Sequence, residues 1–241
     1  SLSIADHVAV VQKQIADACA RSNRSPDDVC LVAVSKKKPN SDILEAIEAG
    51  LQHFGENRVE ESQEKIPIVN DSVNQQVNWH MVGHIQSRKV KDVVSLFDTI
   101  HSLDSLKLAG KLSRTSVDMN KTLSVLVQVN ISGEESKYGF QATNWKTNAT
   151  IKEKLWHDMR EMLALPSLNI VGLMTMAPYV DNIESTRPIF ASLAALASEI
   201  RQSFSIELPE LSMGMTNDYP VAIEEGATIV RVGRAIFGER A

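Results

Sequence analysis

The stretch LVAVSKKKPNSDILEAIEAG, residues 31–50, contains one complete unit of the fold: an apolar strand, a polar loop and a helix. Residues 31–35 predict a strand, because consecutive apolar side chains are typical of a strand that is buried on both faces. Pro39 and the polar residues after it favour a helix start, and Gly50 stands where a helix would end. Units of this kind, repeated, build α/β folds around a parallel sheet.

The same unit recurs along the chain. Further strands are predicted at residues 53–54, 77–82, 99–101, 123–129, 170–174, 210–212 and 228–232. Helices are predicted at residues 4–21, 39–50, 57–65, 87–94, 105–112, 151–163, 184–204 and 219–225. Residues 67–78 form an irregular insert, and residues 133–154 form a long loop together with the start of the helix after it. This alternation favours a single (β/α)8 TIM-like barrel with an extra N-terminal helix. A doubly wound open sheet is the alternative, because the strands at 53–54 and 210–212 are short.

The bulk composition suits one sizeable domain over residues 1–241, with 43% hydrophobic and 23% charged residues. A net charge of -5 argues against broad nucleic-acid binding. Cys19 and Cys30 form no CxxC motif, so we expect neither a zinc site nor a disulfide framework. His80 and His84 are separated by a strand end and Gly83, which disfavours a shared metal. Residues 1–6 contain no basic n-region and no long apolar h-region, and no apolar run approaches the roughly 20 residues of a membrane span. We therefore expect a cytoplasmic protein without a leader.

Lys36 closes the first strand, where a barrel strand reaches the functional end of the fold. A lysine at the mouth of a buried strand is seldom there for packing. Desolvation makes a lysine lose its proton more easily, and the neutral amine can attack an aldehyde. Side-chain alternation puts Lys36 on the face of Val32 and Val34, and Lys37 on the other face. Alternation alone does not say which face is the interior, so a solvated basic loop stays an alternative.

Polar and glycine-rich segments follow the other strands too, and in a barrel they meet on one face. Gly214 and Gly233 follow the last two strands, where barrels often bind phosphate, although plain turns would also need glycine. Arg231 lies inside the last strand and needs a partner there, either a glutamate such as Glu56 or a ligand. Four methionines suit the core or the wall of a flat aromatic ligand: Met174, Met176, Met213 and Met215.

Seven strand-end segments carry a more specific signal. They are LVAVSK (31–36), FGEN (54–57), WHMVGHIQSRK (79–89), QVNISGEESKYGF (128–140), GLMTMAP (172–178), LSMGMTNDY (211–219) and VRVGRAIFG (230–238). Together, and in this order, they resemble the pyridoxal 5'-phosphate (PLP) homeostasis proteins of the YggS/PROSC type. The resemblance covers nearly the whole chain and implies a single barrel similar to the N-terminal domain of alanine racemases, PLP fold type III.

The resemblance also implies roles for individual residues toward PLP. Lys36 matches the lysine that holds the cofactor as an internal aldimine, and Arg231 matches the arginine that faces the pyridine nitrogen. Thr216 stands where the family usually has a serine of the phosphate site. Gly233 and Arg234 match a second loop that holds the phosphate, and there Arg234 stands in place of a small hydroxyl residue. The remaining matches are Asn57, His80, Asn130 and Ser212 around the cofactor, and Lys137 near the site mouth for cofactor entry or transfer.

The implied function is that of a PLP carrier, a monomer that holds the cofactor and releases it to PLP-dependent apo-enzymes. Such a carrier is not expected to be an enzyme itself. PLP is the best electron sink when a carboxylate keeps its nitrogen protonated, and an arginine cannot accept that proton. Because the chain ends at Ala241, we expect no second domain of the kind that gives racemases a catalytic tyrosine. A racemase-like PLP enzyme of narrow specificity is the first alternative. A Schiff-base aldolase for a sugar phosphate, without PLP, is the second.

Overall fold

Eight parallel strands close into a barrel in the computed structural model, which describes residues 1–134 and 138–239. The barrel strands are β1 (Cys30–Val34), β2 (His53–Glu56), β3 (Asn78–Met81), β4 (Thr99–Leu103), β5 (Leu123–Asn130), β7 (Leu168–Met174), β8 (Glu210–Ser212) and β9 (Ile229–Val232). Each strand pairs with the next in this order, and β9 pairs with β1 to complete the ring. The barrel predicted from the sequence is therefore confirmed, and the open sheet is wrong.

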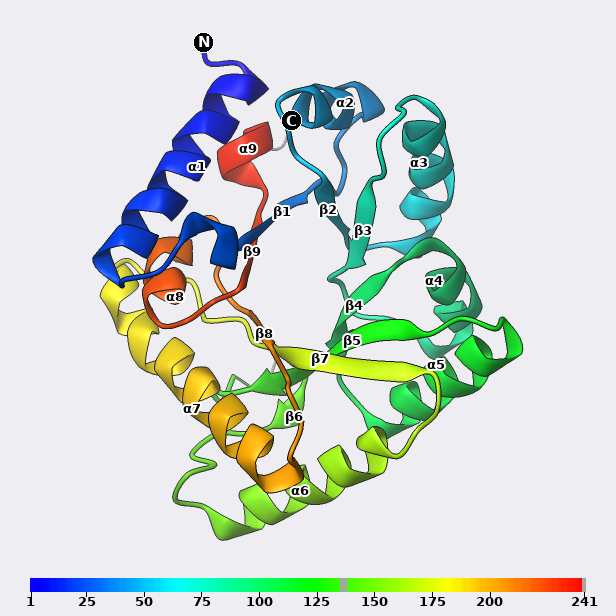
Figure 1. The fold of residues 1–241 in the computed structure, drawn as a ribbon, viewed down its shortest axis with the longest axis vertical. Coiled ribbons are helices and arrows are strands. Elements are labelled where there is room, and N and C mark those ends of the chain that lie inside the picture. The colour runs from blue at the N-terminus through cyan, green and yellow to red at the C-terminus, as the bar shows by residue number, and fades with distance from the viewer. Residues whose placement is uncertain (135–137, 240–241) are drawn as a thin grey trace.

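Helices form a ring outside the strands (Figure 1). They are α1 (Ile4–Arg21), α2 (Asn40–Glu48), α3 (Val59–Asp71), α4 (Val90–Leu96), α5 (Leu106–Asp118), α6 (Ala149–Leu163), α7 (Arg187–Phe204), α8 (Tyr219–Glu224) and α9 (Arg234–Phe237). Short 3-10 helices are η1 (Pro26–Asp28), η2 (Ser87–Lys89) and η3 (Ile183–Thr186). Within the described ranges, no helix is both long enough and apolar enough to cross a bilayer.

The extra N-terminal helix α1 lies alongside α8 and α9 (Figure 1). Ser3 starts it with a capping box, in which its hydroxyl accepts from the Asp6 N–H and the Asp6 carboxylate accepts from the Ser3 N–H. Gln14 then accepts a 2.6 Å hydrogen bond from the Tyr219 hydroxyl of α8. The helix thus supports the last two βα units of the barrel, β8 with α8 and β9 with α9, which include the loops after β8 and β9.

Two sequence expectations about local structure are wrong. Residues 67–71 belong to α3, which continues through Pro67 to Asp71. A proline removes one helical hydrogen bond, but buried Val59, Ile66 and Val69 fix this helix to the barrel and offset that loss. The expected loop after β5 also contains the two-residue strand β6 (Phe140–Gln141), which pairs with the end of β5.

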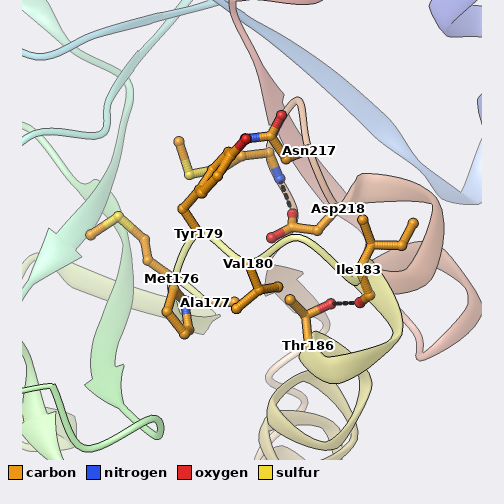
Figure 2. A pocket seen from close by; sticks show the side chains of 10 residues that line it. Met176, Ala177, Tyr179, Val180, Ile183, Thr186, Asn217 and Asp218 are labelled. Carbon is orange, nitrogen blue, oxygen red and sulfur yellow. Dashed lines mark hydrogen bonds between the residues drawn. The ribbon is translucent and has the colours of Figure 1, made fainter.

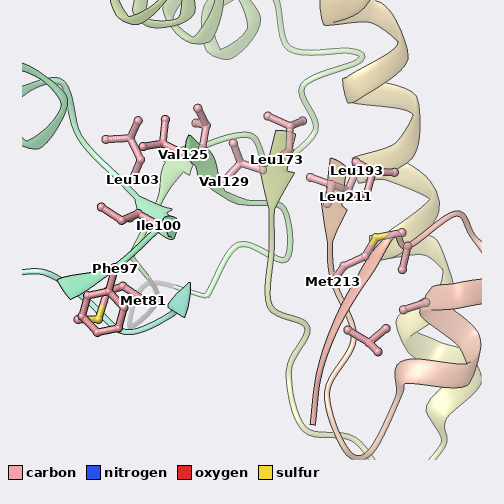
Figure 3. Close-up of a cluster of buried hydrophobic side chains, with 14 of the residues drawn as sticks. Met81, Phe97, Ile100, Leu103, Val125, Val129, Leu173, Leu193, Leu211 and Met213 are labelled. Atoms are coloured by element: carbon pink, nitrogen blue, oxygen red, sulfur yellow. The ribbon is translucent and has the colours of Figure 1, made fainter. Parts of the chain in front are cut away.

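The apolar core has two parts, separated by the wall of the barrel. The larger part fills the space between strands and helices; Leu193 of α7, for example, lies beside Leu211 of β8 (Figure 3). The smaller part lies in the barrel interior, here called the lumen, and consists of Val32, Leu126, Met174 and Ile229. Met213 is fully buried in the outer part, so it cannot line a ligand site in the lumen.

Candidate functional site

Lys36 follows β1 at the carboxyl end of the barrel. The ladder of β1 extends to Ser35, whose N–H donates to the Gly55 carbonyl at 2.9 Å. Val32 packs in the lumen cluster, whereas Ala33 packs against the helices. Because side chains alternate along a strand, the face of β1 that leads to Lys36 is the lumen face. That the Lys36 side chain itself points into the lumen stays a prediction, because Lys36 lies in the turn after β1.

The neighbours of β1 bring several of the predicted residues to the same end of the barrel. β9, which precedes Gly233 and Arg234, pairs with β1 on one side, and β2, which precedes Asn57, pairs on the other. The loop after β9 lies against β1 very closely, since a Cβ atom on Gly233 would stand 3.3 Å from the Val34 carbonyl oxygen. Glycine therefore permits the backbone after β9 to approach the strand end that carries Lys36.

Arg231 is 3% exposed and lies level with Val32 of the adjacent strand. Its guanidinium donates one hydrogen bond to the Ser212 hydroxyl and another, of 3.1 Å, to the Thr175 carbonyl. Burial lowers the pKa of Arg231 to about 10, so the group remains charged at pH 7. The expected alternative, an ion pair with Glu56, is wrong because that carboxylate binds Lys65 at 3.1 Å.

A chain of three histidines leads from Arg231 across the lumen. His101 Nδ1 lies 2.8 Å from Ser212 Oγ, His101 Nε2 lies 2.9 Å from His80 Nδ1, and His80 Nε2 lies 3.0 Å from His53 Nδ1. An arginine can only donate, so the Ser212 proton is free to point at His101. His101 then donates to His80, and His80 to His53. Every link is satisfied when all three rings are neutral.

Electrostatics agree with neutral rings. Burial lowers the pKa of His80 to about 3, with His53 adding to the effect. Burial also lowers the pKa of His101 well below the usual range, and the neighbouring His80 and the Arg231 cation act in the same direction. Both ring nitrogens of His80 are used within the chain, so a polar contact of His80 with a ligand would require breaking it. Its predicted place beside the cofactor stays a prediction.

Acidification is expected to destabilise the protein through His80. Its folded pKa of about 3 lies below the value of about 6.5 for an unfolded histidine. Stability is therefore complete above pH 6.5 and is lost as the pH falls toward 3, at about 1.4 kcal/mol per pH unit. His80→Gln should flatten the fall in the free energy of unfolding between pH 7 and 5 by about 2 kcal/mol, as measured by urea unfolding.

A matched control is His157→Gln, which replaces an exposed histidine of α6. Its pH slope should equal that of the unmodified protein. Burial raises the pKa values of Glu56 and Asp218, so both carboxylates also contribute to the pH dependence of stability. Their contribution is the same in each variant and in the unmodified protein, and it therefore drops out of the difference between them. If His80→Gln and the unmodified protein lose stability in parallel between pH 7 and 5, the neutral state of His80 is wrong.

The loops after β7 and β8 enclose a cavity of about 220 Å³ (Figure 2). Met176 and Tyr179 line it from the β7 loop, and Met215 and Asn217 line it from the β8 loop. The β8 loop is well ordered by its own contacts, because the buried Asp218 carboxylate accepts a 2.7 Å bond from the Met215 N–H. Predicted phosphate-site residue Thr216 lies half-buried in this turn.

Arg234 connects this loop to the one after β9. Its guanidinium donates a 2.7 Å hydrogen bond to Asn217 Oδ1 and lies 3.5 Å from the Glu239 carboxylate. The side chain is 46% exposed, so its cation remains partly hydrated and accessible to an anion. A phosphate contact of Arg234 stays a prediction.

Two predicted amide residues differ in their surroundings. Asn130 uses both ends of its side chain on the loop after β5, donating to the Glu134 carbonyl and accepting from the Gly133 N–H. It therefore organises that loop and lies across the barrel from β1. Asn57 Oδ1, in contrast, is buried with no hydrogen-bond partner among the described residues. Lys137 lies outside the described residues.

Sequence reasoning missed three groups of this site: His53, His101 and the pair formed by Lys65 and Glu56. A signal for the histidines existed, since three successive strands each contain one, but their contact depends on strand register. Among the described residues, no group of three or more His, Cys, Asp or Glu side chains is placed to hold a metal ion. His84 points away from His80, bonding Asp104 at 2.9 Å and stacking on Tyr138.

The amino-acid sequence is similar to that of known proteins over nearly its full length. The pyridoxal phosphate homeostasis protein of Aquifex aeolicus is 38% identical over 239 residues, and the match covers 99% of each chain. The chain belongs to the pyridoxal phosphate homeostasis protein family. The resemblance that the strand-end segments predict is thereby confirmed.

Structural comparison agrees with membership in the pyridoxal phosphate homeostasis protein family. PipY of Synechococcus elongatus, solved with PLP bound, has a TM-score of 0.79 and 36% identity, and the match covers 93% of this chain and all of that one. The family model for the alanine racemase N-terminal domain matches residues 13–241. Alanine racemase of Clostridium difficile shares the fold with a TM-score of 0.69 at 14% identity, and the match covers 57% of its chain.

Proposed function

We propose that this protein binds PLP at the carboxyl end of the barrel, links it to Lys36, and serves in PLP homeostasis as a carrier. The observation that carries the proposal is the position of Arg231, a buried, charged donor in the lumen on the strand next to the one that ends at Lys36. Binding of PLP is supported by the 36% identical PipY, which was solved with PLP bound.

The residues present at this end of the barrel suit PLP in charge and shape. Its phosphate requires backbone amides, hydroxyls or cations, and the loops after β8 and β9 offer Thr216, Gly233 and Arg234. Its aromatic ring requires an apolar wall, which Met176 and Met215 can supply. Asn57 Oδ1, which accepts no hydrogen bond within the described part of the chain, leaves an acceptor for a hydroxyl donor.

Lys36 is the covalent anchor in this proposal. With PLP bound, the ammonium would lose a proton to solvent, the neutral nitrogen would bond to the aldehyde carbon, and the two hydrogens left on that nitrogen would depart with the aldehyde oxygen as water. The C=N bond is hydrolysed by the reverse of these steps, so release needs no other reactant. Phosphate contacts hold the ligand during both steps and limit its escape.

Arg231 makes a carrier more plausible than an enzyme. Bound PLP supplies an aldehyde for capture and an electron-withdrawing ring that is strongest when its nitrogen is protonated. Arg231 can donate a hydrogen bond to that nitrogen but cannot accept one, which disfavours the protonated ring. The fixed guanidinium, held by Ser212 and Thr175, thus orients the ring without making it a strong electron sink.

Amino-acid turnover tests this proposal against a racemase-like enzyme of narrow specificity. The PLP-loaded protein, incubated with each standard amino acid, should show neither racemisation nor transamination at ordinary enzyme rates of roughly 1–1,000 per second. Rates in that range with any of them would overturn the carrier.

The same proposal includes a cytoplasmic, single-domain monomer over residues 1–241 that passes PLP to apo-enzymes. Activation of an apo-enzyme by the loaded protein, faster than by the equivalent free PLP, tests the transfer.

Thr216→Val is expected to weaken PLP retention about tenfold, because a charge-assisted hydrogen bond contributes roughly 1.5 kcal/mol. Pyridoxal, which lacks the phosphate, should bind the variant as it binds the unmodified protein. Equilibrium dialysis measures both ligands, and Thr150→Val, at an exposed threonine of α6, is the control. Equal losses for PLP and pyridoxal would contradict a phosphate role for Thr216.

A further inference from the structure

A buried ionic cluster lies behind the end of β1, formed by Glu56 of β2 with Glu61 and Lys65 of α3. Glu56 is fully buried and Lys65 is 5% exposed. The Lys65 ammonium donates to both carboxylates, at 3.1 Å to Glu56 and 2.5 Å to Glu61, and to the Ser35 carbonyl at 2.7 Å. All three of its protons are therefore used. Buried ion pairs give little net stability, which leaves the purpose of this cluster open.

The cluster contacts the backbone on both sides of Lys36. On the strand side, Ser35 binds it twice, through its carbonyl to Lys65 and through its hydroxyl to Glu56. On the loop side, the Lys37 N–H donates to Glu61 at 2.7 Å. Lys37 has a φ of +61°, a left-handed conformation that costs a non-glycine residue about 1 kcal/mol. Glu61 supplies the contact that stabilises this conformation.

We propose that Glu61 and Lys65 are positioning residues for Lys36. They fix the residue before it and the residue after it, so that the chain leaves β1 in one direction and delivers the Lys36 amine to the lumen. This inference rests on the proposed covalent role of Lys36. Glu61 and Lys65 touch neither the ligand nor the reacting atoms, and they act through the backbone of Ser35 and Lys37.

Glu61→Ala is the most direct test, because it removes the acceptor for Lys37 and Glu61 is 25% exposed, so the fold should tolerate the change. The rate of PLP linkage to Lys36, followed by absorbance and borohydride trapping, should fall about tenfold, since small displacements of a reacting group are costly. The affinity for pyridoxine 5'-phosphate, which has no aldehyde, should stay within twofold. Glu61→Gln retains an acceptor and should restore most of the rate.

Glu64→Ala is the matched control, an exposed glutamate on the same helix, and should behave like the unmodified protein. If Glu61→Ala does not fold, the double variant Glu56→Gln with Lys65→Met, which removes one charge of each sign, should show the same slow linkage. An unchanged linkage rate in Glu61→Ala, or in the double variant where Glu61→Ala does not fold, overturns the positioning role. So does an equal loss of rate and of pyridoxine 5'-phosphate affinity, because the cluster would then shape the whole pocket. Failure of the unmodified protein to link PLP would instead refute the proposed function.

Discussion

Lys36→Ala is expected to abolish the borohydride-stable adduct of PLP completely. Lys36 follows the lumen face of β1, next to the strand that carries Arg231, and is the proposed anchor. The loops after β8 and β9 are unchanged in this variant, so weak, non-covalent binding of PLP should remain. Intact-protein mass spectrometry after reduction measures the adduct, and equilibrium dialysis measures the residual binding.

Lys38→Ala is the matched control for this result, because it removes a lysine two residues away. Lys38 donates to the carbonyls of Gly238 and Glu239 at 3.3 Å and has no proposed contact with PLP. It should form the adduct at the rate of the unmodified protein. A full adduct in Lys36→Ala, located on another lysine, would show that the anchor is misassigned.

Arg231→Gln is expected to have the second-largest effect, on both the cofactor and the fold. The change removes a buried cation and leaves the Thr175 carbonyl without its donor, which costs about 1–3 kcal/mol of unfolding free energy. Relief from burying a charge offsets part of that loss. Affinity for PLP should fall at least tenfold, and the absorbance of the bound cofactor should shift, because the group facing its ring nitrogen has changed.

A spectral titration with PLP and a urea unfolding curve measure these two effects separately. Arg114→Gln, at an exposed arginine of α5, should alter neither. An unchanged absorbance spectrum for the bound cofactor in Arg231→Gln would remove Arg231 from the ring nitrogen. The carrier proposal would then lose its main chemical argument against enzyme activity.

Sequence patterns predicted the barrel and the place of Lys36 well, because both follow from local order along the chain. Each strand and its helix are adjacent in sequence, and Lys36 comes at the end of a clear apolar strand. The extent of α3 was harder to predict, since Pro67 normally signals an end. Burial of Val69 beyond the proline depends on tertiary packing, which a local pattern does not contain.

Contacts between distant strands could not be predicted in the same way. The chain from His53 through His80 to His101 depends on the register of three strands, and it reaches Ser212 more than 100 residues later. Lys65 presented a similar difficulty. Glu61 and Lys65 have the spacing of an ordinary exposed helix pair, and only the packing of α3 against the β1 end reveals that Lys65 is buried.

The covalent binding of PLP to Lys36 is best tested by the absorbance of the purified protein after addition of PLP, followed by borohydride reduction and peptide mass mapping. We expect a new band of the linked cofactor and a reduced adduct on the peptide that contains Lys36, at one PLP per chain. A protein that gives no band and no adduct, or an adduct spread over surface lysines, would contradict it.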